Sequence, residues 1–253
     1  MISITNLYKI PLYYISFQKN KKVEEQYRSY GFSDINHFSA VPGKKLDIKK
    51  LREEDLISIR SYDDLLSGRF EHSGMPSLGA IGCTLSHYEL WCLCEDTNLP
   101  YIIIAEEDNK MGRKLGEKDI QNIISVLDKP NSIFISTNIS KRDHRKHFFG
   151  TNFYIASKGA CKKLAEKCFP IDVQTDWYMA HLATIGDVII EGYPISRQNK
   201  TGSSIQKMCI TCWLPKNNWF YIGVCSFILI ILISVVYYRY VWKACEESCG
   251  SDQ

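Results

Sequence analysis

The chain has 253 residues, with 31 Lys or Arg against 28 Asp or Glu and a formal net charge of +3. This length suits one sizeable core, because domains commonly run from about 100 to 200 residues. Charges of both signs are interspersed, so there is no broad basic field for duplex nucleic acid, and we expect no nucleic-acid partner. The ten cysteines are not regularly spaced. A chain this long needs no disulfides for stability, so reduced, buried cysteines in a reducing compartment are the simpler interpretation.

Hydrophobic patterns and turn residues predict secondary structure along the first 170 residues. In chain order, we expect strands at 12–17, 37–43, 101–105, 132–136 and 152–156, and helices at 23–30, 85–96, 117–127 and 158–168. The charged stretch 44–74 is expected to be irregular with one short helix, residues 79–82 to be a flexible approach to a helix, and the basic stretch 141–147 to be a solvated loop. Strands that alternate with helices indicate an α/β fold with a mostly parallel sheet.

The C-terminal run 219–238 contains no charge and has aromatic residues at both ends. About 20 apolar residues cross the hydrocarbon core of a bilayer, and aromatic side chains settle at its interfaces. We therefore expect a globular domain over 1–205, a juxtamembrane linker over 206–218, a transmembrane helix over 219–238 and a short tail over 239–253. A buried core helix is the less favoured interpretation of the run.

The N-terminus has no basic start followed by an apolar segment, so it does not resemble a signal peptide. Lysines are slightly more frequent before the expected span than after it, which favours a cytosolic domain in a single-pass protein held by a C-terminal anchor. A lumenal orientation stays open. The pair Cys209 and Cys212 forms a lone CxxC, for which free thiols are favoured over a zinc site because the next pair would lie across the membrane.

Three consecutive acidic residues, Glu106, Glu107 and Asp108, follow the predicted strand 101–105. Ligands of open α/β sheets bind beyond the carboxyl ends of the strands. Strand alternation should direct Glu106 and Asp108 to one side and Glu107 to the other. Carboxylates two residues apart can share a hard divalent cation that bridges the oxygens of a diphosphate. Taken alone, the triplet is more simply a helix cap or a solvated turn.

Four segments, in order, resemble glycosyltransferase family 25, the group that contains bacterial lipooligosaccharide and animal collagen galactosyltransferases. They are PLYYIS with QKNKK, HFSAVPG, GAIGCTLSHYELW with NLPYIIIAEED, and TNFYIASKGACKKLAE with TDWYM. The third is the most specific, being similar to the family's G-x-x-G-C-x-x-S-H followed by an apolar strand and Glu-Asp-Asp. Two departures stand out: Glu107 occupies the position of the family's usual aspartate, and Lys21 or Lys22 stands in for its arginine after the first strand.

The resemblance implies a GT-A-type nucleotide-binding domain that transfers a hexose, galactose among the candidates, from a UDP-sugar to a hydroxyl acceptor, with inversion at the anomeric carbon. It implies that Glu106 and Asp108, helped by Glu107, hold Mn²⁺ or Mg²⁺ on the donor diphosphate. The family's later aspartate aligns best with Asp176, as general base or orienting group for the acceptor, and less well with Asp172. Further donor-binding candidates in the matched segments are Ser16, Lys22, Gly82, Ser86 and His87.

Plainer interpretations accompany these assignments. Ser86 can simply start a helix, His87 can be a structural histidine that orients a loop, and Gly82 can serve tight backbone geometry instead of phosphate binding. Asp176 can be a surface carboxylate or a cap. For the whole protein, the rival functions are a non-catalytic membrane-anchored binding or adhesion protein that keeps the fold, since Glu107 alters the acidic motif, and a membrane adaptor that works through the basic stretch 141–147.

Overall fold

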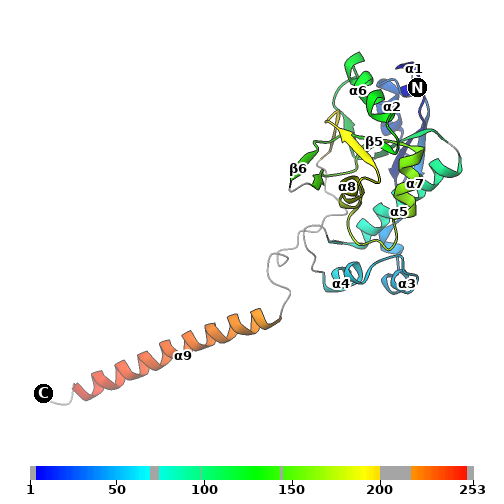
Figure 1. Ribbon diagram of the computed structural model, residues 1–253. Helices are drawn as coiled ribbons and strands as arrows, with labels where there is room; N and C mark the ends of the chain where they lie inside the picture. Colours follow the sequence, from blue (N-terminus) through cyan, green and yellow to red (C-terminus); the bar gives the residue numbers. More distant parts are fainter. Residues whose placement is uncertain (1–3, 69–73, 98, 143–144, 200–217, 250–253) are drawn as a thin grey trace. The chain divides into compact units, whose positions relative to one another are not determined.

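The computed structural model describes residues 4–68, 74–97, 99–142, 145–199 and 218–249 (Figure 1). The chain divides into two compact units, Met1–Cys209 and Ile210–Gln253. The first unit is built around one six-stranded sheet. The second consists, within the described residues, of a single helix.

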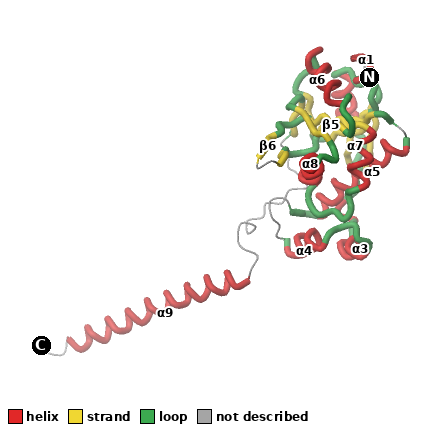
Figure 2. The backbone as a smooth tube through the Cα atoms, viewed as in Figure 1, coloured by secondary structure: helices red, strands yellow, loops and turns green. Residues whose placement is uncertain are grey.

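The strands of the central sheet, drawn in yellow in Figure 2, have the order β2-β1-β3-β8-β5-β9. Its strands are β1 (Leu12–Ser16), β2 (Ile35–Ser39), β3 (Tyr101–Glu106), β5 (Ser132–Ile135), β8 (Phe153–Ser157) and β9 (Ile189–Gly192). The pairs β1/β2, β1/β3 and β5/β9 are parallel, whereas β8 runs antiparallel to both β3 and β5. One strand therefore opposes the other five, and the expected mixed α/β fold with a mostly parallel sheet is confirmed.

Both faces of the sheet are covered by apolar side chains. Along β3, Ile102 and Ile104 belong to one buried cluster, and Ile103 and Ala105 belong to another. The first cluster includes residues of the helices α5 (Leu78–Asp96), α7 (Lys158–Glu166) and α8 (Thr175–Ile185), and the second includes residues of α1 (Ile4–Leu7), α2 (Lys21–Ser29) and α6 (Glu117–Leu127). The continuous apolar run of β3 thus has the burial on two faces that its sequence indicates.

The stretch 44–74 is more regular than expected. It contains the end of the 3₁₀ helix η1 (Gly43–Lys45) and the helices α3 (Ile48–Glu53) and α4 (Ile59–Ser67). Asp47 and Ser58 cap α3 and α4, since their side-chain oxygens accept hydrogen bonds from Lys49 N and Ser61 N. These two caps satisfy backbone amides in the first turn of each helix. Asp47 and Ser58 are therefore the residues from which the two helices could have been predicted.

Residues 79–82 are also helical, contrary to the expected flexible approach. Helix α5 begins at Leu78, and the Ser77 hydroxyl accepts a hydrogen bond from Ala80 N. Glycine costs about 1 kcal/mol relative to alanine in a helix interior. The close packing of Gly82 against another segment, described below, explains why a glycine is present there despite that cost.

The basic stretch 141–147 is not simply a solvated loop. It lies in a hairpin formed by β6 (Ser140–Arg142) and β7 (Arg145–His147). Lys146 N donates to Thr184 Oγ1 over 3.0 Å, and Lys146 Nζ donates to the Ile190 carbonyl over 3.0 Å. Burial lowers the pKa of Lys146, although the carboxylate of Glu191 opposes the shift. A second small sheet pairs β4 (Asn109–Met111) with β10 (Ser196–Gln198).

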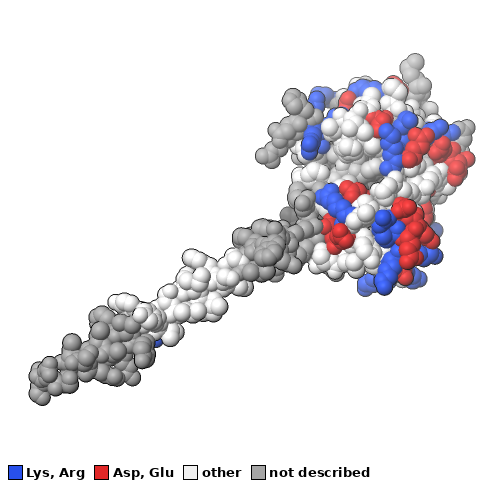
Figure 3. Space-filling model, turned by 60° about the horizontal axis from the view of Figure 1, so that its bottom comes forward, with Lys and Arg blue, Asp and Glu red and all other residues white. Residues whose placement is uncertain are grey.

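The burial of the cysteines in the first unit agrees only in part with the expectation. Cys94, Cys161 and Cys168 are buried and free, whereas Cys83 and Cys92 are free and partly buried. Acidic and basic side chains of this unit lie next to one another on the face seen in Figure 3.

Helix α9 (Asn218–Cys249) contains the apolar run 219–238. No helix in the described part of the chain is both long enough and apolar enough to cross a membrane, so the expected transmembrane span is not supported. Most of the expected linker, with Cys209 and Cys212, lies outside the described residues. The cytosolic location of the large domain stays a prediction.

Candidate functional site

The acidic triplet lies where β3 ends, held on both sides by backbone hydrogen bonds. Glu106 N donates to the Asn152 carbonyl over 3.0 Å, and Glu107 N donates to the Ile15 carbonyl over 3.1 Å. The Asp108 carbonyl accepts from Asn199 N over 2.8 Å. Glu106 and Asp108 are partly buried whereas Glu107 is exposed, in keeping with the expected alternation.

A pocket of about 170 Å³ adjoins this strand end. It is lined by Ala80, Cys83, Glu106, Phe149, Gly150, Thr151, Gln174, Thr175, Asp176 and Gln198. The pocket therefore brings Glu106 from β3 together with Asp176 from the first turn of α8, 70 positions further along the chain. Asp172, the alternative aspartate, lies elsewhere: its carboxylate binds the Ser58 hydroxyl and Arg60, and it lines a different pocket.

Backbone amides hold the Asp176 carboxylate. Its Oδ2 accepts from Gly150 N over 3.0 Å, and its Oδ1 accepts from Trp177 N over 2.9 Å. Burial raises the pKa of Asp176, and the charge of Glu106 adds to the rise, although both amide hydrogen bonds oppose it. A carboxylate that is oriented by backbone donors and has a raised pKa suits proton transfer.

Asp108 has one carboxylate oxygen without a hydrogen-bond partner. Its Oδ2 accepts from Gln198 Nε2 over 2.9 Å, while Oδ1 is buried and unpaired within the described structure. Burial raises the pKa of Asp108, as do the carboxylates of Glu106 and Glu107, although the Gln198 hydrogen bond opposes the rise. Buried carboxylate oxygens normally have a partner, and a hard divalent cation would provide one. One oxygen of Asp108 is thus available to the metal that the sequence suggested.

Glu106 has polar partners that favour its charged form. Its Oε1 accepts from Thr151 Oγ1 over 2.9 Å and lies 3.7 Å from Nε2 of the buried His87. Burial tends to raise the pKa of Glu106, but the interactions with His87 and Thr151 outweigh it, and the net effect is a lowered pKa. The Glu106 carboxylate is therefore ionised at neutral pH and available to a ligand.

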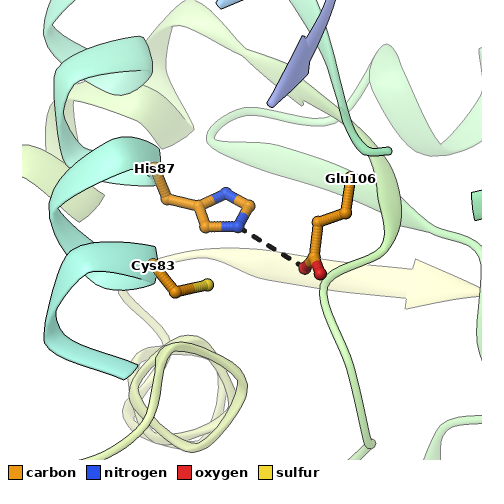
Figure 4. Close-up of side chains that lie close together, drawn as sticks. All are labelled: Cys83, His87 and Glu106. Atoms are coloured by element: carbon orange, nitrogen blue, oxygen red, sulfur yellow. Dashed lines mark ion pairs between the residues drawn. The ribbon is translucent and has the colours of Figure 1, made fainter. Parts of the chain in front are cut away.

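Three groups with metal-binding side chains meet in the same place. Cys83 and His87 project from α5 toward Glu106 (Figure 4), and one ligand atom from each lies within 4.8 Å of the others. Burial raises the pKa of the Cys83 thiol well above its usual value. Since the thiolate is the form that binds metals, burial weakens Cys83 as a ligand.

Ser86 and Gly82 hold two backbone segments together, and their donor-binding roles stay predictions. The Ser86 hydroxyl accepts from Val41 N over 2.9 Å and donates to the Gly82 carbonyl over 2.7 Å. A Cβ on Gly82 would lie 2.4 Å from the Val41 carbonyl oxygen and 3.1 Å from Gly43 N. The two sequence segments GAIGCTLSH and AVPG are therefore in direct contact, and Gly82 serves the tight backbone geometry considered above.

Replacing Gly82 by alanine is expected to lower the free energy of unfolding by about 1–3 kcal/mol, because the added methyl group overpacks this contact. Thermal unfolding of the first unit, followed by circular dichroism, measures the change. Gly223→Ala is the matched control, since nothing lies within 4 Å of a Cβ at this glycine in α9. Equal midpoints for Gly82→Ala and the wild-type chain would show that the loop yields without cost.

Among the candidate residues, Glu106 and Asp176 line the pocket, and the others, including Asp108 and His87, do not. Ser16 ends β1, the strand next to β3, and its hydroxyl donates to the Gln18 carbonyl. Lys22 is exposed in the first turn of α2, and Glu107 is exposed beside the pocket-lining Glu106. Their donor-binding roles stay predictions. Conversely, Thr151 and Gln198 line the pocket but were not among the predicted site residues, because only the folded sheet brings them to Glu106.

Comparison with known proteins identifies the family of the chain. The family model for glycosyltransferase family 25 (LPS biosynthesis protein) matches residues 10–147, more than half of the chain. The chain belongs to glycosyltransferase family 25. This match includes the two segments that meet at Gly82 and the acidic triplet.

Relatives of this family 25 chain are longer proteins. A glycosyltransferase 25 family member of Drosophila pseudoobscura pseudoobscura is 26% identical over 178 residues, which cover 61% of this chain and 27% of that protein. One from Drosophila melanogaster is 32% identical over 91 residues, covering 36% and 14%. Among solved structures, a glycosyltransferase involved in the glycosylation of the major capsid of PBCV-1 matches at 12% identity and a TM-score of 0.35, over 73% of this chain and 81% of that one. The chain thus spans less than a third of either fly relative.

Proposed function

We propose that the chain is a metal-dependent glycosyltransferase of the GT-A type, which transfers a hexose from a UDP-sugar to a hydroxyl group on a glycan, a glycolipid or a protein. The observation that carries this proposal is the pocket shared by Glu106 and Asp176, in a chain that belongs to family 25. Two carboxylates with opposite pKa shifts in one pocket suit two different tasks in a reaction.

Glu106 and Asp108 are the residues that would hold Mn²⁺ or Mg²⁺. The unpaired Oδ1 of Asp108 supports this assignment, as does the position of both residues at the carboxyl end of a strand in the sheet. When bound, such a cation offsets the charge that develops on the departing diphosphate. Gln198, which donates to Asp108 Oδ2, keeps the carboxylate oriented for this role.

Asp176 is the residue that would take the proton of the acceptor hydroxyl. Its two backbone donors leave further lone pairs on the same oxygens for that hydrogen bond, and its raised pKa brings it closer to that of an effective base at neutral pH. Deprotonated acceptor oxygen then attacks the anomeric carbon as the bond to the diphosphate breaks, which inverts the configuration there. Asp176 and Glu106 line the same pocket, so the base would lie next to the donor side of the site.

The full chain, incubated with UDP-galactose or UDP-glucose and Mn²⁺, is expected to release UDP at a rate that EDTA abolishes. Even without acceptor, donor hydrolysis by water gives a measurable signal, and added acceptor hydroxyls should increase it. A chain that neither binds a UDP-sugar in the presence of Mn²⁺ nor releases UDP would support the rival interpretation, a binding protein that keeps the fold.

A further inference from the structure

A line of buried polar rings lies behind Glu106. Trp91 and His87 stand one turn apart on α5, Tyr154 lies on β8, and all three are fully buried. Trp91 Nε1 lies 2.9 Å from the Tyr154 hydroxyl oxygen, which lies 2.8 Å from His87 Nδ1. The His87 and Tyr154 rings are stacked with centroids 5.6 Å apart. Apolar rings would fill this part of the core without the cost of burying polar atoms. The three buried polar side chains therefore indicate a role beyond packing.

The donors and acceptors in this line have one consistent direction. An indole N–H can only donate, so the Tyr154 oxygen accepts from Trp91. Its own hydrogen then goes to His87 Nδ1, the remaining partner of that hydroxyl. This assignment makes Nδ1 an acceptor and places the imidazole proton on Nε2, the nitrogen that faces Glu106.

The line continues to the carboxylate. His87 Nε2 lies 3.5 Å from Thr151 Oγ1 and 3.7 Å from Glu106 Oε1, and the Thr151 hydroxyl donates to the same Oε1 over 2.9 Å. Figure 4 shows the imidazole directed at the Glu106 carboxylate. The hydrogen bonds from Trp91 to Tyr154 and from Tyr154 to His87 thus lead to the His87 Nε2–H, which faces Glu106 Oε1 beside the Thr151 hydroxyl.

A metal ion shared by Cys83, His87 and Glu106 fits this network poorly. Binding at His87 Nε2 would require the proton on Nδ1, so that Tyr154 would accept from both Trp91 and His87. The Tyr154 hydrogen would then lack an acceptor among its contacts in the described structure, at a cost of about 1–3 kcal/mol for an unsatisfied buried group. The network thus favours a positioning role over a second metal centre.

We propose that Tyr154, supported by Trp91, is a positioning residue: it holds His87 in the Nε2–H tautomer, and His87 with Thr151 orients Glu106 toward the metal and donor. This inference rests on the proposed function for its consequence in metal binding. The tautomer itself belongs to the fold and can be measured without any substrate.

The tautomer is tested on the full chain labelled with ¹⁵N-histidine. Two-bond ¹⁵N–¹H spectra are expected to show His87 as the Nε2–H form, with its signals identified by their loss in His87→Gln. Tyr154→Phe should convert these signals to a mixture of both tautomers. Wild-type His87 in the Nδ1–H form, or as imidazolium at neutral pH, would overturn the proposal, whether or not Tyr154→Phe folds.

The consequence for Glu106 is tested by Mn²⁺ binding with UDP present, followed by the EPR signal of free Mn²⁺. Disturbing a group behind a metal ligand costs about 10- to 100-fold in affinity, and this is the loss we expect for Tyr154→Phe. Tyr193→Phe is the matched control, because its hydroxyl binds Asp119 on α6, outside the pocket, and should leave Mn²⁺ affinity unchanged.

The Mn²⁺ measurements distinguish the positioning role of Tyr154 from the proposed function. If Tyr154→Phe binds Mn²⁺ as tightly as Tyr193→Phe and the wild-type chain, the positioning role is wrong and the proposed function stands. A wild-type chain that binds no Mn²⁺ removes the metal-dependent function, and the ¹⁵N spectra then decide the tautomer by themselves.

Discussion

Asp176→Asn is expected to lower kcat/KM for sugar transfer by about 10²- to 10⁴-fold, the range typical of losing a general base. The amide keeps the shape of the side chain, and its oxygen can still accept one of the two backbone hydrogen bonds, from Gly150 N or Trp177 N. It cannot take a proton from the acceptor. Donor affinity should change little, since the carboxylates placed on the metal are Glu106 and Asp108. Initial rates with varied acceptor, together with UDP binding, measure both quantities.

The pH dependence of the wild-type rate gives a second measure of the same residue. Because burial raises the pKa of Asp176, the pH at which kcat/KM declines on the acid side should lie above the ordinary aspartate pKa of 3.8. Below that pH the carboxylate is protonated and cannot act as a base, so activity is lost as pH falls. This decline should be missing from the residual activity of Asp176→Asn.

Asp172→Asn is the matched control, since Asp172 is the other aspartate that the family pattern allowed. Its carboxylate binds Ser58 and Arg60 and is half exposed. Its loss should cost a modest amount of stability, at most about 1 kcal/mol for an exposed ion pair, and leave the rate within a few-fold of the wild type. A large loss with Asp172→Asn and a normal rate with Asp176→Asn would reverse the assignment.

The parts of the fold that the sequence predicted are those where a local pattern and the tertiary environment agree. The run at 101–105 is apolar on both faces and becomes β3, and the amphipathic stretch 117–127 becomes α6 with the expected bounds. Helix α8 was not predicted, because apolar and aromatic residues occur all around it and leave no clear polar face. Its visible signal is Gly186 in the left-handed region, which ends the helix.

The direction of β8 could not be predicted either. β5 and β8 are neighbours joined through the β6/β7 hairpin, without a crossover helix, so the chain returns antiparallel. The hairpin was not predicted, because the stretch 141–147 was interpreted as a loop. Its pairing depends on contacts such as Lys146 with Thr184 and Ile190, which are distant in the sequence.

For the site, the sequence identified the carboxylates but not what holds them. Glu106, Asp108 and Asp176 follow from the strand end and the family pattern. Gln198 reaches Asp108 only because β10 pairs with β4, and neither of these short strands was predicted from the sequence. Tyr154 lies in an apolar strand, where an aromatic side chain is expected to be part of the core. The hydrogen bonds of its hydroxyl with His87 and Trp91, which are seen only in the folded chain, indicate its positioning role.

Asp108→Asn is expected to be the most damaging change at the metal side of the site. A bound cation contributes several kcal/mol of charge stabilisation in the transition state, which corresponds to about 10³-fold in rate. The buried Oδ1 has no other partner in the described structure, so its negative charge is the feature that a cation would use. Mn²⁺ affinity, measured by EPR with UDP present, should fall together with kcat/KM.

Asp108→Asn should not lower the stability of the metal-free chain, although it lowers Mn²⁺ affinity and kcat/KM. This combination distinguishes a metal ligand from a structural carboxylate. Burial raises the pKa of Asp108, so its charge is unfavourable in the folded chain, and the neutral amide should unfold at the same or a higher temperature without metal. Asp96→Asn removes an exposed carboxylate at the end of α5 and should change neither property. If Asp108→Asn lowers the melting temperature and keeps full Mn²⁺ affinity, Asp108 supports the fold through Gln198 and does not bind the metal.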